Sequence, residues 1–122
     1  MTQPVHVQLT PPRHQNWFAY FPEDYRWSAA VAGMLGTAQF GGAEVSEVDR
    51  VGRRLRSWIG DDQAWFAEWG AEAGRLQGLA VEAEAAGRRL TAAGLHLRAC
   101  CYLQMGERFR IPKPKFLSTR TG

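Results

Sequence analysis

The stretch LTAAGLHLRACCYLQMGERF, residues 90–109, decides the fold of this 122-residue chain. On a helical wheel, five of its side chains share one narrow stripe at alternating spacings of four and three: Leu95, Ala99, Tyr102, Gly106 and Phe109. Thr91 is a typical N-cap residue, and the prolines at positions 112 and 114 disfavour a helix beyond them. The stretch therefore predicts a helix from after Thr91 to about Arg110 that packs along this stripe.

Residues 62–86 predict a second helix, which pairs with the first as a hairpin. Six apolar side chains share one of its faces: Trp65, Trp69, Leu76, Leu79, Ala80 and Ala83. Asp61 or Asp62 can cap its start, and Gly87 is typical of a position just beyond a helix end.

Two further helices are predicted upstream, separated by a turn at FGGAE, residues 40–44. The first, residues 25–39, repeats Trp27, Val31, Met34 and Ala38 at helical spacing. The second is predicted to begin at Ser46 as N-cap, with Asp49 in capping-box position, and to carry the stripe Val48, Val51, Leu55 and Trp58 up to Gly60. Because no window alternates with period two, we expect an all-α fold of about four main helices in two antiparallel hairpins.

The chain divides into three parts by composition. Residues 1–24 hold four of the six prolines and are expected to form an irregular arm, with the aromatic run WFAYF, residues 17–21, lying against the helical body. Residues 25–111 form the helical domain, and residues 112–122 are expected to be a basic, flexible tail.

Charge and cysteine content limit the classes of partner. The net charge is only +3 and the basic residues form no single tract, so nucleic acid is not an expected partner. No apolar run has the length of a membrane span or a signal peptide. Two adjacent cysteines cannot form a disulfide framework, which favours a reducing cytoplasm. We therefore expect a cytoplasmic protein with no membrane partner.

Sites for metals or covalent catalysis are weakly supported. His96 and Cys100 are the candidate metal ligands because they lie one helical turn apart, but zinc needs three or four ligands and no further pair follows. Both cysteines are therefore interpreted as small hydrophobic packing residues. No serine lies in G-x-S-x-G, and there is no Walker or dinucleotide motif. No catalytic residue and no cofactor are predicted, and enzymatic activity of the chain alone is uncertain.

Glu72 stands out because it falls beside the apolar stripe of residues 62–86. It is either a perturbed acid in a pocket or one half of an ion pair with Arg75, Arg88 or Arg89. A further basic cluster is interpreted as a solvated surface, with an acidic partner as the alternative: Arg50, Arg53, Arg54 and Arg56. Six residues are candidates to line a substrate pocket or face a partner: Trp27, Met34, Trp65, Trp69, Glu72 and Tyr102.

A family resemblance follows from several segments together, over about residues 25–112. These are WSAAVAGMLG (27–36), the GG pair, EVDRV (47–51), AWFAEW (64–69) and the 90–109 stretch. They resemble the N-terminal helical region of α/β-hydrolases related to the fermentation–respiration switch protein and 2,6-dihydropseudooxynicotine hydrolase. The family pattern "YLRAxxYYxxAERF" is matched by Leu97, Arg98, Ala99, Tyr102 and residues 106–109, with Cys100, Cys101 and Gly106 as departures.

The resemblance implies a helical cap over a separate catalytic domain, which would carry the catalytic Ser, acid and His. None of that domain's motifs occurs here, so the chain is expected to be either a truncated product or a lone cap that packs on a catalytic partner or on a second copy. Two alternatives remain: a free-standing helical interaction module, and a small enzyme using Glu72 or Cys100. Because a cap would leave one face of the Trp-rich helices without a partner in the isolated chain, we expect a dimer or a monomer with a sticky apolar surface.

Overall fold

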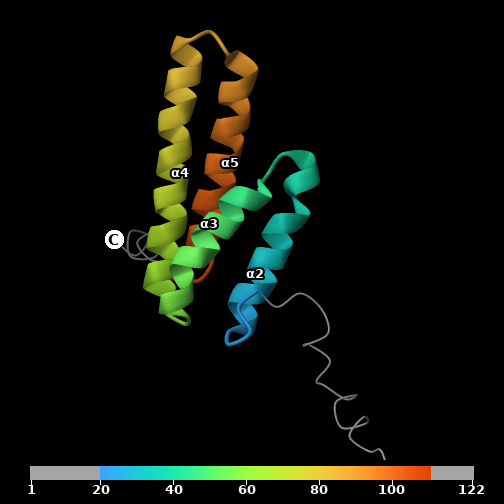
Figure 1. Ribbon diagram of the computed structural model, residues 1–122, viewed down its shortest axis with the longest axis vertical. Coiled ribbons are helices and arrows are strands. Elements are labelled where there is room, and N and C mark those ends of the chain that lie inside the picture. The colour runs from blue at the N-terminus through green and yellow to red at the C-terminus, as the bar shows by residue number, and fades with distance from the viewer. Residues whose placement is uncertain (1–19, 111–122) are drawn as a thin grey trace, which may run out of the picture.

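The computed structural model describes residues 20–110, which form four α-helices running alternately up and down (Figure 1). They are α2 (Tyr25–Gly36), α3 (Val45–Leu55), α4 (Asp62–Ala85) and α5 (Arg89–Glu107), with 3-10 turns η2 (Ala38–Phe40) and η3 (Arg56–Trp58). No strand occurs within these residues, which confirms the predicted all-α class. Most of the expected arm and the whole of the expected tail lie outside the described residues.

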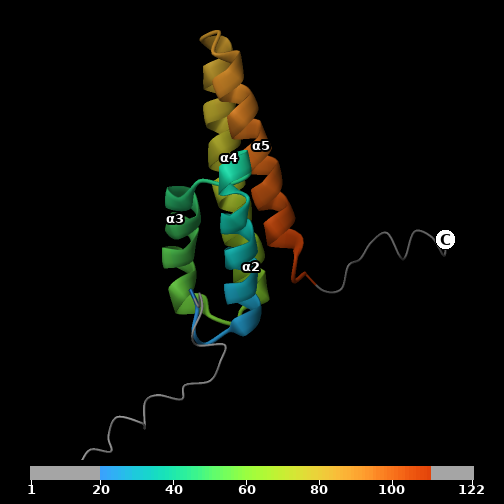
Figure 2. The ribbon, with the colours of Figure 1, turned by 90° about the vertical axis from the view of Figure 1, so that its right-hand side faces the viewer.

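The helices form two antiparallel pairs of unequal length. The α4–α5 hairpin is the longer pair, and the shorter α2 and α3 lie against its lower part, as two perpendicular views show (Figures 1 and 2). Within residues 20–110, no helix combines the length and the apolar character that a membrane crossing requires.

Local capping interactions set some of the helix ends, but not all of them. The Asp61 side chain accepts hydrogen bonds from the backbone N–H groups of residues 63 and 64, which fixes the start of α4 as expected. Gly87, with φ of 79°, reverses the chain after α4. Because only residues 86–88 separate the two helices, α5 already begins at Arg89, and the predicted Thr91 N-cap is wrong.

The predicted start of α3 is also wrong. This helix begins at Val45, with Glu44 extended at the N-cap position. The backbone N–H of Glu44 donates to the hydroxyl of Tyr102, 3.0 Å away. A tertiary contact therefore sets this helix start, in place of the capping box expected at Ser46 and Asp49.

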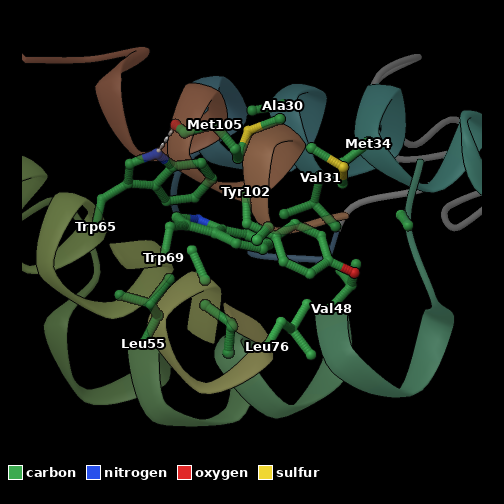
Figure 3. Packing of buried hydrophobic residues seen from close by; sticks show 14 of the residues in the cluster. Ala30, Val31, Met34, Val48, Leu55, Trp65, Trp69, Leu76, Tyr102 and Met105 are labelled. Carbon is green, nitrogen blue, oxygen red and sulfur yellow. Dashed lines mark hydrogen bonds between the residues drawn. The ribbon is translucent and has the colours of Figure 1, made fainter. Parts of the chain in front are cut away.

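A continuous chain of aromatic rings forms the centre of the core. Successive ring centroids lie 5.2 Å apart for Phe21–Trp27, 4.9 Å for Trp27–Trp65, 5.6 Å for Trp65–Trp69 and 5.5 Å for Trp69–Tyr102. Each such pair adds about 0.5–1.5 kcal/mol beyond the burial of its area. The α4 tryptophans lie between side chains of α2 and of α3 (Figure 3). Both side chains are completely buried, and the expected dimerisation or stickiness of the isolated chain stays a prediction.

Two indole N–H groups tie this core to neighbouring elements. Trp65 donates to the carbonyl of Met105 at 2.7 Å, the dashed contact in Figure 3. Trp27 donates to the Asp62 carboxylate at 3.0 Å. These bonds join α4 to α5 and α2 to the start of α4, because each donor and its acceptor come from different helices.

Close approach of α4 and α5 depends on Gly106. A Cβ at this position would lie 3.2 Å from the Cβ of Trp69 and 3.4 Å from the carbonyl oxygen of Phe66. The second contact is with backbone, which has little freedom to move aside. Gly106 thus allows the helix spacing that buries the Trp69 ring.

Candidate functional site

A buried carboxylate, Glu47, joins the start of α3 to α5. Its side chain accepts two hydrogen bonds from the Arg98 guanidinium, at 2.8 and 3.0 Å, and one from the Tyr102 hydroxyl at 2.7 Å. Glu47 is only 7% exposed, so the bidentate pairing compensates for removing its charge from water. The same Tyr102 oxygen accepts the bond from Glu44 described above. We call Glu47, Arg98 and Tyr102 the α3 clamp.

A second buried carboxylate, Glu72, lies beside this clamp on α4. It accepts a 2.6 Å hydrogen bond from Arg75, and the guanidinium groups of Arg50 and Arg54 approach to 3.5 and 3.7 Å. The ion-pair interpretation of Glu72 is therefore confirmed with Arg75 as partner. Arg88 and Arg89 are not its partners, because they follow the end of α4 at Ala85, and thirteen residues at 1.5 Å rise put that end about 20 Å from Glu72.

The basic face of α3 is exposed to solvent, and its arginines also contact neighbouring side chains. Arg54 donates to Glu68 at 2.6 Å and Arg53 to Asp49 at 2.7 Å, while Arg56 lies over the Tyr20 ring, 4.8 Å from its centroid. The four arginines are exposed, as the predicted solvated surface requires, and α4 supplies acidic neighbours for Arg54 and Arg50.

The clamp keeps the Tyr102 hydroxyl protonated and the Arg98 guanidinium charged. Burial, followed by the hydrogen bond to Glu47, raises the pKa of the Tyr102 hydroxyl well above its ordinary value. The hydrogen bond to Glu47 raises the pKa of Arg98, and the bond to Glu72 raises that of Arg75, so both guanidinium groups stay charged. The network is therefore suited to holding helices together, and its carboxylates are occupied by protein partners.

An apolar groove lies between α2 and the start of α3, with a volume of about 690 Å³. Its apolar lining comes from both helices and their connection: Leu35, Ala38, Ala43, Val45 and Val48. Tyr20 closes one side, and Glu44 and Asp49 contribute carboxylates. Val45 is 62% exposed, and Phe40, in the same connection, is 78% exposed.

A smaller cavity of about 200 Å³ lies between α2 and α5 and is lined in part by Cys101, Met34 and Met105. Cys101 is partly buried, whereas Cys100 is exposed. The packing role predicted for Cys100 is wrong because its flank of α5 is covered by neither α4 nor α2. Leu97 and Leu103 of α5 are likewise 47% and 43% exposed.

The candidate metal pair is not assembled. His96 lies 3.2 Å from the carboxylate of Glu84, across the hairpin, rather than beside a thiol ligand set. Among residues 20–110, no group of three or more His, Cys, Asp or Glu side chains is placed to hold a metal ion.

The structure brings the six predicted pocket or partner residues together in the core. Trp27, Trp65, Trp69, Tyr102 and Glu72 are at most 1% exposed, and Met34 is 5% exposed. A substrate or partner would therefore meet the surface around them before their side chains, and their functional role stays a prediction. The sequence interpretation missed Glu47, although its position four residues before Val51 places it on the apolar stripe of α3.

The chain is similar over most of its length to proteins named as hydrolases. Hydrolase acrC of Aspergillus aculeatus is 33% identical over 97 residues, which are 80% of this chain and 22% of that protein. 20-Hydroxy-prefusarin hydrolase FUS2 of Gibberella moniliformis is 38% identical over 74 residues, 61% of this chain and 17% of the relative. Alpha/beta hydrolase xenA of Xenoacremonium sinensis is 31% identical over 84 residues, 69% of this chain and 19% of the relative.

The chain thus spans about a fifth of the length of these relatives. The predicted relationship to hydrolases, including one named as an α/β-hydrolase, is confirmed at this level, whereas the specific subtype stays a prediction. No protein-family model matches the chain, and no solved structure matches it.

Proposed function

We propose that this chain is a helical cap-type domain of the α/β-hydrolase kind, which acts by packing on a catalytic domain. The proposal rests on one observation: the similarity covers most of this chain but only a small part of each relative. Between 61% and 80% of the chain aligns with hydrolases, but the aligned part is only 17–22% of each of them. An all-helical segment of that size is expected to be one accessory element of a larger enzyme.

The chemistry of the described residues supports an accessory role. The two buried carboxylates, Glu47 and Glu72, are engaged by arginines and a tyrosine, so their contacts stabilise the bundle. The surface, in contrast, exposes apolar side chains next to a groove. Apolar surface of this kind is typical of a protein interface. In this proposal the hydrolytic chemistry belongs to the partner domain, and the cap contributes a wall and shields the reaction from water.

A domain exchange with a relative tests the proposal. In acrC, the region that aligns with this chain is replaced by the chain itself, and the chimera is compared with intact acrC and with acrC carrying an unrelated helical bundle of equal length. The probe is a p-nitrophenyl ester that intact acrC is first shown to hydrolyse. We expect the chimera to keep at least about a tenth of the intact activity and to purify as one species.

The unrelated bundle is the control, and it should give an inactive or aggregated protein. A chimera that behaves no better than this control would refute a cap role for the chain. Stable self-association of the isolated chain together with that result would favour the free-standing interaction module.

A further inference from the structure

We infer that the groove between α2 and α3 is the surface on which the catalytic domain docks, with Phe40 as its aromatic anchor. This inference rests on the proposed function and names the contact surface. The occupant to which it commits is the catalytic domain of an α/β-hydrolase, because more than three quarters of each relative lies outside the region that aligns with this chain.

The groove has the composition of an interface centre. Its apolar walls come from two helices and the turn between them, and charged groups are confined to Glu44 and Asp49. Interface centres are poor in charge and rich in aromatic anchors. Phe40 meets this description, since 78% of its surface is exposed in the connection that bounds the groove. A partner that covers the groove together with this connection would also bury the phenyl ring.

Backbone hydrogen bonds also fix the conformation of the turn that bounds the groove. The backbone N–H groups of Phe40 and Gly42 both donate to the Thr37 carbonyl, at 2.9 and 3.0 Å. A Cβ on Gly42 would lie only 2.7 Å from the Thr37 hydroxyl oxygen, so the turn is tightly closed. Preorganisation of this kind lowers the entropy cost of binding.

The opposite wall of the groove is fixed by the α3 clamp. Glu47 lies in the first turn of α3, two residues after Val45, and its bonds to Arg98 and Tyr102 anchor that turn to α5. The exposed carboxylate of Glu44 at the edge of the groove is placed for an Arg or Lys of the partner. The α3 clamp therefore supports docking indirectly. It positions the groove wall, and its own side chains do not contact the partner.

The test uses the acrC chimera with two groove variants and two matched controls. Val45→Asp puts a charge into the groove at the first position of α3, where the helix dipole favours an acidic residue. Its control is Val81→Asp on α4, because Val81 is 61% exposed against 62% for Val45. Phe40→Ser is paired with Leu90→Ser, whose side chain is 90% exposed at the hairpin turn.

We expect each groove variant to lower ester hydrolysis by the chimera at least tenfold and to separate one calorimetric unfolding transition into two. The controls should stay within twofold of the parent chimera. In the isolated full chain, all four variants should keep the parent melting temperature within a few degrees, since no catalytic domain covers the groove there.

The outcomes separate the two proposals. If the parent chimera itself fails against the unrelated-bundle control, the cap function falls and this inference falls with it. If the parent chimera works and the groove variants match their controls, the cap function stands and the docking surface is wrong. A large loss of melting temperature in the isolated groove variants would show that the chain itself fills the groove, and dissociation of a dimer by Val45→Asp would identify a second copy as occupant. Either result overturns the inference.

Discussion

Replacing Glu47 by Gln should destabilise the domain strongly, although the change alters one atom. The substitution removes the charge that compensates Arg98, whose side chain is only 18% exposed. Removing one partner of a buried ion pair costs about 3–5 kcal/mol, and the residual exposure of Arg98 places the loss near 3 kcal/mol. Against a typical total of about 5–15 kcal/mol, this is a large fraction of the stability. Urea unfolding followed by circular dichroism at 222 nm measures it.

Glu84→Gln is the matched control because the Glu84 carboxylate contacts the His96 ring at 3.2 Å on the surface, where both side chains are about half exposed. Its loss should be below about 1 kcal/mol. The double variant Glu47→Gln with Arg98→Met should recover part of the lost stability, because the uncompensated charge is then absent. Equal unfolding midpoints for Glu47→Gln and Glu84→Gln would refute the clamp.

Three further predictions concern packing, thiols and pH. Gly106→Ala should cost about 1–3 kcal/mol in thermal unfolding, since its Cβ presses on α4, whereas Gly78→Ala, with open space around it, should gain about 0.5–1 kcal/mol. Cys100 should react faster than Cys101 with Ellman's reagent in the Cys→Ser single variants, because Cys100 is exposed whereas burial raises the pKa of Cys101. Burial alone would raise the pKa of Asp62, but hydrogen bonds from an arginine and an indole outweigh it and lower the value below 3.8. The stabilisation from Asp62 is therefore complete above pH 3.8 and is lost as the pH falls further, so Asp62→Asn should flatten the acid side of the unfolding curve.

The helices could be predicted from the sequence because each buries a face that repeats with helical period. The stripe Leu95–Ala99–Tyr102–Gly106 is buried as predicted, and Trp65 and Trp69 lie on the buried face of α4. Exposure at the edges of the stripes was harder to predict. Trp58 is 52% exposed, because the chain tightens into a 3-10 turn before it and the helical spacing no longer applies.

The buried network could be predicted only in part. Glu72 and Arg75 lie three residues apart on one helix, so their pairing follows from local spacing. Glu47 meets Arg98 and Tyr102 across 51 and 55 residues, and no local pattern specifies such a partner. The groove depends on the relative placement of α2 and α3, which periodicity does not determine.

The unequal length of the helix pairs has a consequence for local opening. Above α2 and α3, the two long helices pack against each other and against no other element of residues 20–110 (Figure 1), with small buried side chains such as Ala83 and Ala92. Amide protons near Gly87 should therefore exchange with deuterium through partial opening at low free energy, while those around Trp69 should exchange only when the whole domain unfolds. The hairpin apex can fray and re-form without disturbing the groove, so a catalytic partner docked at α2 and α3 would leave the apex free to move.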